Sequence, residues 1–281
     1  MGNNSIRSNV TVDDVISEIR MFSSADRKKK IVIVEGIDDL KLISKFVNKD
    51  IIVKESFNGK AGVLKIKEVY KDKNNIIGIV DKDYDENYLN KKGLFYYDFS
   101  SMEIMMINHL DVFESLCSEC SMIKNDVETF RNEILNRLIS ISLLRKYNYI
   151  NELGININEI PINNLVLEDN TICDTKLLNI VETRNGRNKN WLDNKDAIRE
   201  YININKNKSH TIDELMYLTR GHDFVYMFLV YCSSIKGKKY GVDILQGFLR
   251  CAFTLQHFKS TKLWTSLNYY CEEEGLNFFR N

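Results

Sequence analysis

The sequence predicts an α/β fold in which a mostly parallel four-stranded sheet precedes a mainly helical region. Three observations support this prediction. Four short apolar runs between residues 31 and 97 have the length of buried strands. Segments with the apolar spacing of helices alternate with most of them, which is typical of parallel strands joined by right-handed crossovers. Beyond residue 115 only helical periodicity is strong, and an Asn-rich stretch lies at about 151–207.

The expected elements follow one another along the chain. A helix is expected over residues 10–22, because Thr11 suits an N-cap and the apolar stripe includes Val15, Ile16 and Ile19. The next elements are a strand at 31–34, a helix at 38–47, a strand at 51–53, a turn at 58–62, a helix at 63–70, strands at 76–80 and 93–97, and a helix from Ser101.

The second half has long helical patterns at 127–144, 212–234 and 242–258. These patterns predict three parts for the chain. An N-terminal helix occupies residues 1–25, an α/β domain occupies residues 26–115, and a helical domain occupies residues 116–281.

Charge and composition restrict the function classes. The formal net charge is zero, so a nucleic acid would have to be bound by a local patch. The sequence has no run of about 18 apolar residues, so no membrane span is expected. Residues 1–9 lack the apolar core of a secretory signal. We therefore expect a cytoplasmic protein without membrane contact. Cys117 and Cys120 have CxxC spacing but no second pair, so the six cysteines are expected to be structural or free thiols.

Acidic residues follow two of the predicted strands. Glu35 ends the first strand and Asp39 lies about one helical turn further on, while Asp81 and Asp83 follow the strand at 76–80. If these strands are adjacent and parallel, the four carboxylates can converge at the edge where open α/β sheets bind ligands. Clustered carboxylates require a counter-charge. Mg²⁺, or Mn²⁺ in its place, supplies that charge and can polarise a phosphoryl oxygen.

The acidic motifs resemble those of a known family. The pattern Val34-Glu35-Gly36-x-x-Asp39, the turn Asn58-Gly59-Lys60 and the strand end Asp81-x-Asp83 resemble the Toprim domain, a Rossmann-like fold. The resemblance covers about residues 30–110. It implies a catalytic role for Glu35 and Mg²⁺ binding by Asp81 and Asp83, with Asp39 as the second acid of the first motif.

A narrower resemblance extends into the second half. Ser101 and Glu103 lie where OLD-type Toprim nucleases carry a serine and a metal-binding glutamate, although Ile104 replaces an asparagine common in that family. With the Gly221-His222-Asp223 segment, the layout is similar to the Toprim effectors of PARIS anti-phage systems. This resemblance implies a toxic nuclease that cleaves RNA, tRNA in particular, under the control of a partner ATPase of the ABC/OLD type.

Several alternatives stay open at this stage. Glu35 could cap a helix, and residues 81–85 could form an exposed turn. Lys60 and His222 are candidate substrate-binding residues. The alternatives are that Lys60 only completes a turn and that His222 has a structural role. Residues 184–191 combine basic side chains with an aromatic one, as a nucleic-acid contact loop or an exposed polar loop would. A DNA-cleaving repair nuclease, a non-catalytic binding module and a homodimer also remain open.

Overall fold

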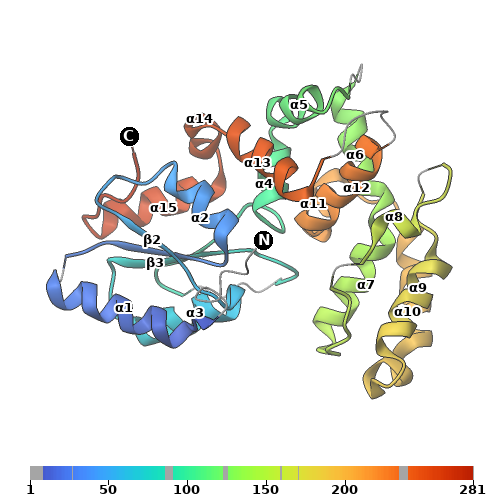
Figure 1. Ribbon diagram of the computed structural model, residues 1–281, viewed down its shortest axis with the longest axis horizontal. Coiled ribbons are helices and arrows are strands. Elements are labelled where there is room, and N and C mark those ends of the chain that lie inside the picture. The colour runs from blue at the N-terminus through green and yellow to red at the C-terminus, as the bar shows by residue number, and fades with distance from the viewer. Residues whose placement is uncertain are drawn as a thin grey trace. The chain divides into compact units, whose positions relative to one another are not determined.

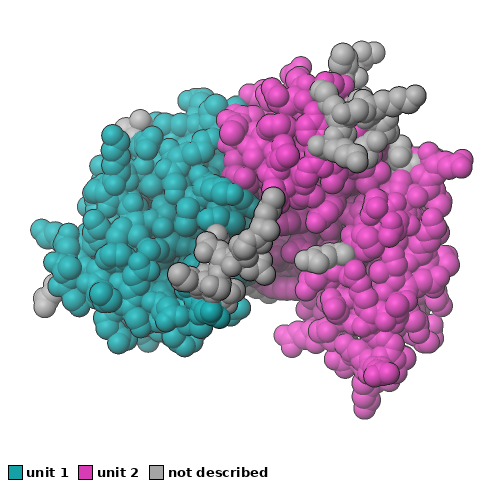
Figure 2. Space-filling model, in the orientation of Figure 1, with its two compact units in different colours: residues 1–82, 87–98, 253–281 teal, residues 83–86, 99–252 magenta. Residues whose placement is uncertain are grey.

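The computed structural model describes residues 9–26, 28–85, 91–122, 126–158, 160–169, 171–233 and 240–280 (Figure 1). By its contacts the chain divides into two compact units, coloured in Figure 2. Unit 1 contains residues 1–82, 87–98 and 253–281, and unit 2 contains residues 83–86 and 99–252. Each unit is described by itself.

Unit 1 contains a four-stranded parallel sheet, which confirms the predicted α/β class. Its strands have the order β2-β1-β3-β4 and are β1 (Ile31–Val34), β2 (Ile52–Glu55), β3 (Ile76–Val80) and β4 (Leu94–Tyr96). Every residue of β1 and β3 is buried, as expected for aliphatic runs covered on both faces. These two strands therefore form the centre of the sheet.

The two acid-bearing strands are adjacent and parallel, as convergence of their carboxylates requires. β1 pairs in parallel with β3, and Val34 is in register with Ile79. The residues that follow the two strands therefore leave the sheet at the same edge, which places Glu35 and Asp81 side by side.

Helices cover both faces of this sheet (Figure 1). One face packs against α1 (Val12–Ala25) and α3 (Gly59–Val69), whose apolar side chains join those of β1 and β3 in one core. The other face carries α2 (Ile37–Ser44) and α15 (Lys262–Glu273). The short α14 (Leu255–Lys259) precedes α15.

The turn expected at 58–62 is mostly helical, because α3 begins at Gly59 with Asn58 as its N-cap. Gly59 has a φ of +52°, which favours glycine at this position. A Cβ at Gly62 would lie 2.8 Å from Ser56 Oγ, so glycine lets the helix approach the end of β2 closely. Gly59 and Gly62, which resemble turn residues in the sequence, thus permit α3 to begin close to the end of β2.

The C-terminal segment 253–281 belongs to unit 1 with the sheet, a grouping that cuts across the expected boundary at 115/116. Val47 and Phe279 form an antiparallel bridge, and the Asn48 N–H donates to the Phe278 carbonyl at 2.8 Å. The Asp98 carboxylate accepts the N–H groups of Lys262 and Leu263, which stabilises the start of α15.

Unit 2 is helical in its described residues. Its helices are α4 (Met102–Asn108), α5 (Leu110–Glu119), α6 (Val127–Arg137), α7 (Ile139–Ile150), α8 (Ile162–Leu165), α9 (Asp174–Asn185), α10 (Lys189–Lys206), α11 (Ile212–Leu218), α12 (Gly221–Ser233) and α13 (Val242–Ala252). Each of the three long helical patterns is thus divided, at Leu138, near Thr219 and near Phe253. The Asn-rich stretch forms α8 to α10. No helix in the described part of the chain is long and apolar enough to cross a membrane.

Lys67 of α3 makes the stability of the folded protein depend on pH. It is 3% exposed, and its Nζ donates to the Ile76 carbonyl at 2.6 Å. Burial lowers the pKa of Lys67 to about 8. Between that pH and about 10.4, the ordinary lysine value, the unfolded chain binds more protons than the folded chain, so stability rises with pH.

Between pH 8 and pH 10.4, we expect the free energy of unfolding of wild-type protein to rise by about 2–3 kcal/mol relative to that of Lys67→Met. Urea unfolding of both proteins across this pH range measures the difference. Lys65→Met, on the same helix but at an exposed side chain, is the matched control. A constant difference between wild type and Lys67→Met across this range would show that Lys67 does not titrate in it.

Candidate functional site

Glu35 lies at the carboxyl end of β1 and faces the end of β3. Its Oε1 accepts the backbone N–H of Asp81 at 2.7 Å. This bond crosses between the two central strands, so Glu35 and Asp81 belong to one small region. The predicted meeting of the two acidic motifs therefore holds for these two residues.

Asp39 belongs to the first turn of α2. Its Oδ2 accepts the Gly36 N–H at 3.1 Å and so helps to cap its own helix. Asp38, the neighbouring acid, instead forms an exposed ion pair with Lys41 at 3.2 Å. The structure therefore gives Asp39 a role in capping α2, and Asp38 faces a different partner.

Tyr97 lies close to Glu35, Asp39 and Asp81, the predicted site acids of unit 1. Its side chain is 1% exposed, and its hydroxyl makes no hydrogen bond of standard geometry within the described residues. Burial raises the pKa of Tyr97 well above its ordinary value, and the negative charges of Asp39, Asp81 and Glu35 raise it further. The hydroxyl therefore stays protonated beside three carboxylates. No local sequence pattern indicates this position for Tyr97.

The start of α3 approaches the same edge of the sheet. A Cβ at Gly59 would lie 3.6 Å from Glu35 Oε2. Lys60 Nζ donates to the Lys82 carbonyl at 3.2 Å and lies 5.9 Å from the centre of the Tyr96 ring. The predicted substrate-binding lysine is thus a cation at the end of β3, next to the acids.

Asp83 and Glu103, the other predicted metal ligands, belong to unit 2. The Asp83 N–H donates to the Ser100 carbonyl at 3.0 Å. Glu103 is 3% exposed on α4, and its oxygens accept from Gln246 Nε2 at 2.9 Å and Ser101 Oγ at 3.2 Å. Gln246, from α13, is a partner that the sequence did not indicate, because 143 residues separate the two positions.

The Gly221-His222-Asp223 segment opens α12 next to Glu103. A Cβ at Gly221 would lie 2.4 Å from both Glu103 Oε2 and Ser101 Oγ, so glycine is the residue that leaves room for the buried carboxylate. His222 Nε2 lies 3.6 Å from Glu103 Oε1, with its side chain half exposed. Asp223 turns into the core of unit 2. Gly221 and His222 therefore lie against the buried Glu103, and His222 is the accessible one of the two.

The basic stretch at 184–191 is not an exposed aromatic loop. Trp191 is 1% exposed and belongs to the buried face of α10. Arg184 donates to the Asn158 carbonyl. Since the indole is covered, it cannot serve as a platform for base stacking. The six cysteines form no disulfide, as expected for structural or free thiols.

The described residues contain no set of three or more His, Cys, Asp or Glu side chains arranged as a metal cage. A cage of that kind is not required by Mg²⁺, which usually keeps several waters and takes one or two carboxylates from the protein. The hard oxygen donors of Glu35, Asp39 and Asp81 fit this cation. The buried Tyr97 hydroxyl lies within electrostatic range of all three carboxylates, which places them in one polar region.

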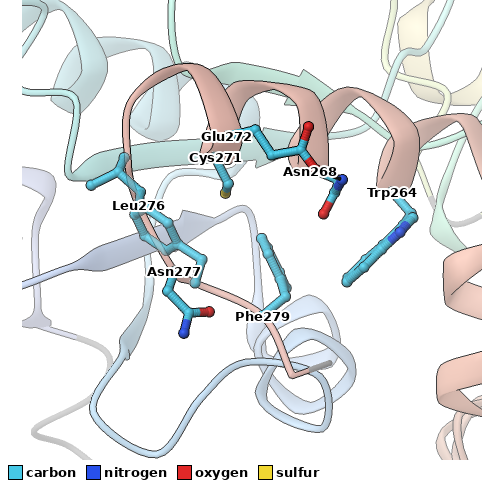
Figure 3. A pocket seen from close by; sticks show the side chains of 8 residues that line it. Trp264, Asn268, Cys271, Glu272, Leu276, Asn277 and Phe279 are labelled. Atoms are coloured by element: carbon cyan, nitrogen blue, oxygen red, sulfur yellow. Dashed lines mark hydrogen bonds between the residues drawn. The ribbon is translucent and has the colours of Figure 1, made fainter.

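A separate pocket of about 250 Å³ lies between α15 and residues 276–279, which follow that helix (Figure 3). The rings of Trp264 and Phe279 face it, with centroids 5.7 Å apart. Asn268 and Glu272 line it from α15 and share a hydrogen bond of 2.7 Å. None of the predicted acidic site residues lines this pocket, so it is distinct from the acidic edge of the sheet.

A scan of the chain against protein-family models finds no match, and a search of curated proteins finds no relative.

Proposed function

We propose that this chain is a Mg²⁺-dependent nuclease built on a Toprim domain. The observation that supports the proposal best is the gathering of Glu35, Asp39 and Asp81 around Tyr97, at the carboxyl ends of the two central strands. Acids at this edge of an open parallel sheet are placed where such folds bind their ligands. The Toprim assignment itself rests on the resemblance of residues 30–110.

In this proposal Asp39, Asp81 and Asp83 hold the metal, and Glu103 contributes to it. Asp83 follows Asp81 by two residues, so the covalent chain keeps their Cα atoms within about 7 Å. A bound Mg²⁺ would polarise the phosphoryl oxygen and neutralise the charge that develops on the leaving oxygen.

The chain's own groups supply the remaining chemistry. Glu35 accepts the proton of the attacking water, as a positioned carboxylate can. Tyr97 keeps its proton and can donate it in a hydrogen bond toward the carboxylates, because its pKa is raised. Lys60 supplies a positive charge at the end of β3, where a phosphate of the substrate would be bound. His222 is the exposed polar group next to Glu103 and is proposed as a second substrate contact.

The substrate and the biological role rest on the resemblance to PARIS effectors. The proposed substrate is RNA, tRNA in particular, and the proposed role is that of a toxic cytoplasmic effector in anti-phage defence. A partner ATPase of the ABC/OLD type would restrain it.

The test compares cleavage of different nucleic acids with toxicity in cells. Purified protein is incubated with Mg²⁺ and total cellular RNA, purified tRNA or plasmid DNA, with EDTA and Glu35→Gln as controls. The same two proteins are expressed in cells from an inducible promoter. We expect RNA cleavage and growth arrest that both require Glu35. Cleavage of DNA alone would support a repair-type nuclease, and the absence of both cleavage and toxicity would support a non-catalytic module.

A further inference from the structure

We propose that Arg145 and Tyr149 of α7, together with Asp223 of α12, form a clamp that holds the turn of residues 83–85 and thereby positions Asp83. These three are positioning residues: Tyr149 contacts the turn directly, Arg145 and Asp223 act on Tyr84 through their charges, and none of them is assigned a contact with the reacting atoms. The inference rests on the proposed function in one respect, namely that Asp83 is a metal ligand. All the groups involved lie in unit 2.

The backbone of Asp83 needs external support. Its φ is +53°, in the left-handed region that residues other than glycine rarely occupy. Such a conformation persists when surrounding contacts hold it in place. One contact is the hydrogen bond from the Asp83 N–H to the Ser100 carbonyl at 3.0 Å. Ser100 is itself fixed by its Oγ, which donates to the Thr219 carbonyl just before α12.

Helix α7 provides the second set of contacts. Arg145 and Tyr149 are four residues apart and therefore lie on one face of the helix. The Tyr149 hydroxyl donates to Asp85 Oδ1. The Tyr149 ring also packs against the ring of Tyr84, with a centroid distance of 5.6 Å and an interplanar angle of 59°. Two consecutive residues of the turn are thus bound to a single side chain of α7.

The buried ion pair beside the turn gives the clamp its rigidity. Arg145 donates from Nε and Nη2 to the two oxygens of Asp223, at 2.6 and 2.9 Å. Its Nη1 donates to the Ile157 carbonyl at 2.8 Å. Both side chains of the pair are about 5% exposed. A bidentate pair that also binds a backbone carbonyl has few alternative geometries.

Tyr84 connects the ion pair with the turn. Its hydroxyl is buried. Burial raises the pKa of Tyr84, the charges of Asp223 and Asp83 raise it further, and the positive charge of Arg145 acts in the opposite direction. The residue between Asp83 and Asp85 is therefore inserted next to the ion pair. Movement of α7 or of the first turn of α12 would be transmitted to Asp83 through these contacts.

The test uses mild variants that keep the fold. Tyr149→Phe removes only the hydroxyl that binds Asp85, and Arg145→Lys keeps the charge but loses the bidentate geometry. Tyr147→Phe is the matched control, because it removes a hydroxyl from the same helix at a ring that packs against Tyr201. Hydrogen exchange of the peptide covering residues 80–85 is measured first, and Mn²⁺ affinity is then measured by titration calorimetry.

We expect exchange in residues 80–85 to accelerate at least threefold in Tyr149→Phe and in Arg145→Lys, with no change in Tyr147→Phe. We also expect Mn²⁺ binding to weaken roughly threefold or more in both clamp variants, as loss of one hydrogen bond to a charged group predicts. Unchanged exchange in both variants would refute the clamp, whether or not the protein is a nuclease. Faster exchange with unchanged Mn²⁺ affinity would refute the positioning role. Wild-type protein that binds no Mn²⁺ would refute the proposed function and, with it, that role.

Discussion

Glu35→Gln is expected to lower the rate of nucleic-acid cleavage about 10³-fold, the loss typical of removing a general base, and to abolish toxicity in cells. Glutamine keeps an oxygen that can accept the Asp81 N–H, the bond that Glu35 makes at 2.7 Å. The fold should therefore survive the substitution while the proton acceptor is lost. Cleavage rates at saturating Mg²⁺, together with thermal unfolding, separate these two effects.

Glu55→Gln is the matched control for this prediction. Glu55 is the carboxylate that ends the neighbouring strand β2, in register with Val34, and no role in the site is proposed for it. Its variant should keep nearly full activity. If Glu35→Gln cleaved or killed as well as wild type, the catalytic assignment would be wrong.

Asp223→Ala is expected to destabilise the protein by about 3–5 kcal/mol, because it leaves the buried Arg145 without its counter-charge. The loss should be seen as a lower urea midpoint for the helical unit. Asp193→Ala replaces an exposed aspartate in the interior of α10 and should change stability by less than about 0.5 kcal/mol.

A double variant, Arg145→Met with Asp223→Leu, provides a stricter test of the same ion pair. Replacing both charges by apolar groups of similar size is often neutral for stability. The double variant should therefore regain most of the stability lost in Asp223→Ala. Equal destabilisation of the single and the double variant would show that the side-chain volumes, rather than the charges, stabilise this part of unit 2.

The parts of the fold that depend on local patterns could be predicted from the sequence. The aliphatic runs at 31–34 and 76–80 are buried strands, as their composition indicates. Their adjacency could not be predicted from local patterns, because the crossover rule sets the handedness of a connection and not the order of the strands. The start of α3 could not be predicted, since two glycines that permit a helix to begin close to Ser56 look like turn residues. Pairing of Val47 with Phe279 depends on residues 232 positions apart, and no local pattern indicates it.

The candidate site also contains residues that could be predicted from the sequence and residues that could not. The meeting of Glu35 with Asp81 could be expected on the condition that their strands are adjacent, because each acid follows its strand directly. Tyr97 and Gln246 could not, because their roles depend on burial and on contacts with distant residues. The aromatic residue of the basic stretch, Trp191, is buried because its helix needs an apolar face, which composition alone does not reveal. Sequence order locates the acids but not the groups that surround them.

Direct measurement of Mn²⁺ binding by titration calorimetry tests the central claim, that the acids at the ends of β1 and β3 hold a divalent cation. We predict about one bound ion per chain for wild type and at least a tenfold loss of affinity in Asp81→Asn, since one or two direct carboxylate ligands supply most of such a site. Asp38→Asn, which changes the neighbouring acid paired with Lys41, should bind like wild type. Absence of binding in wild type, or equal affinity in wild type and Asp81→Asn, would contradict the proposed metal site.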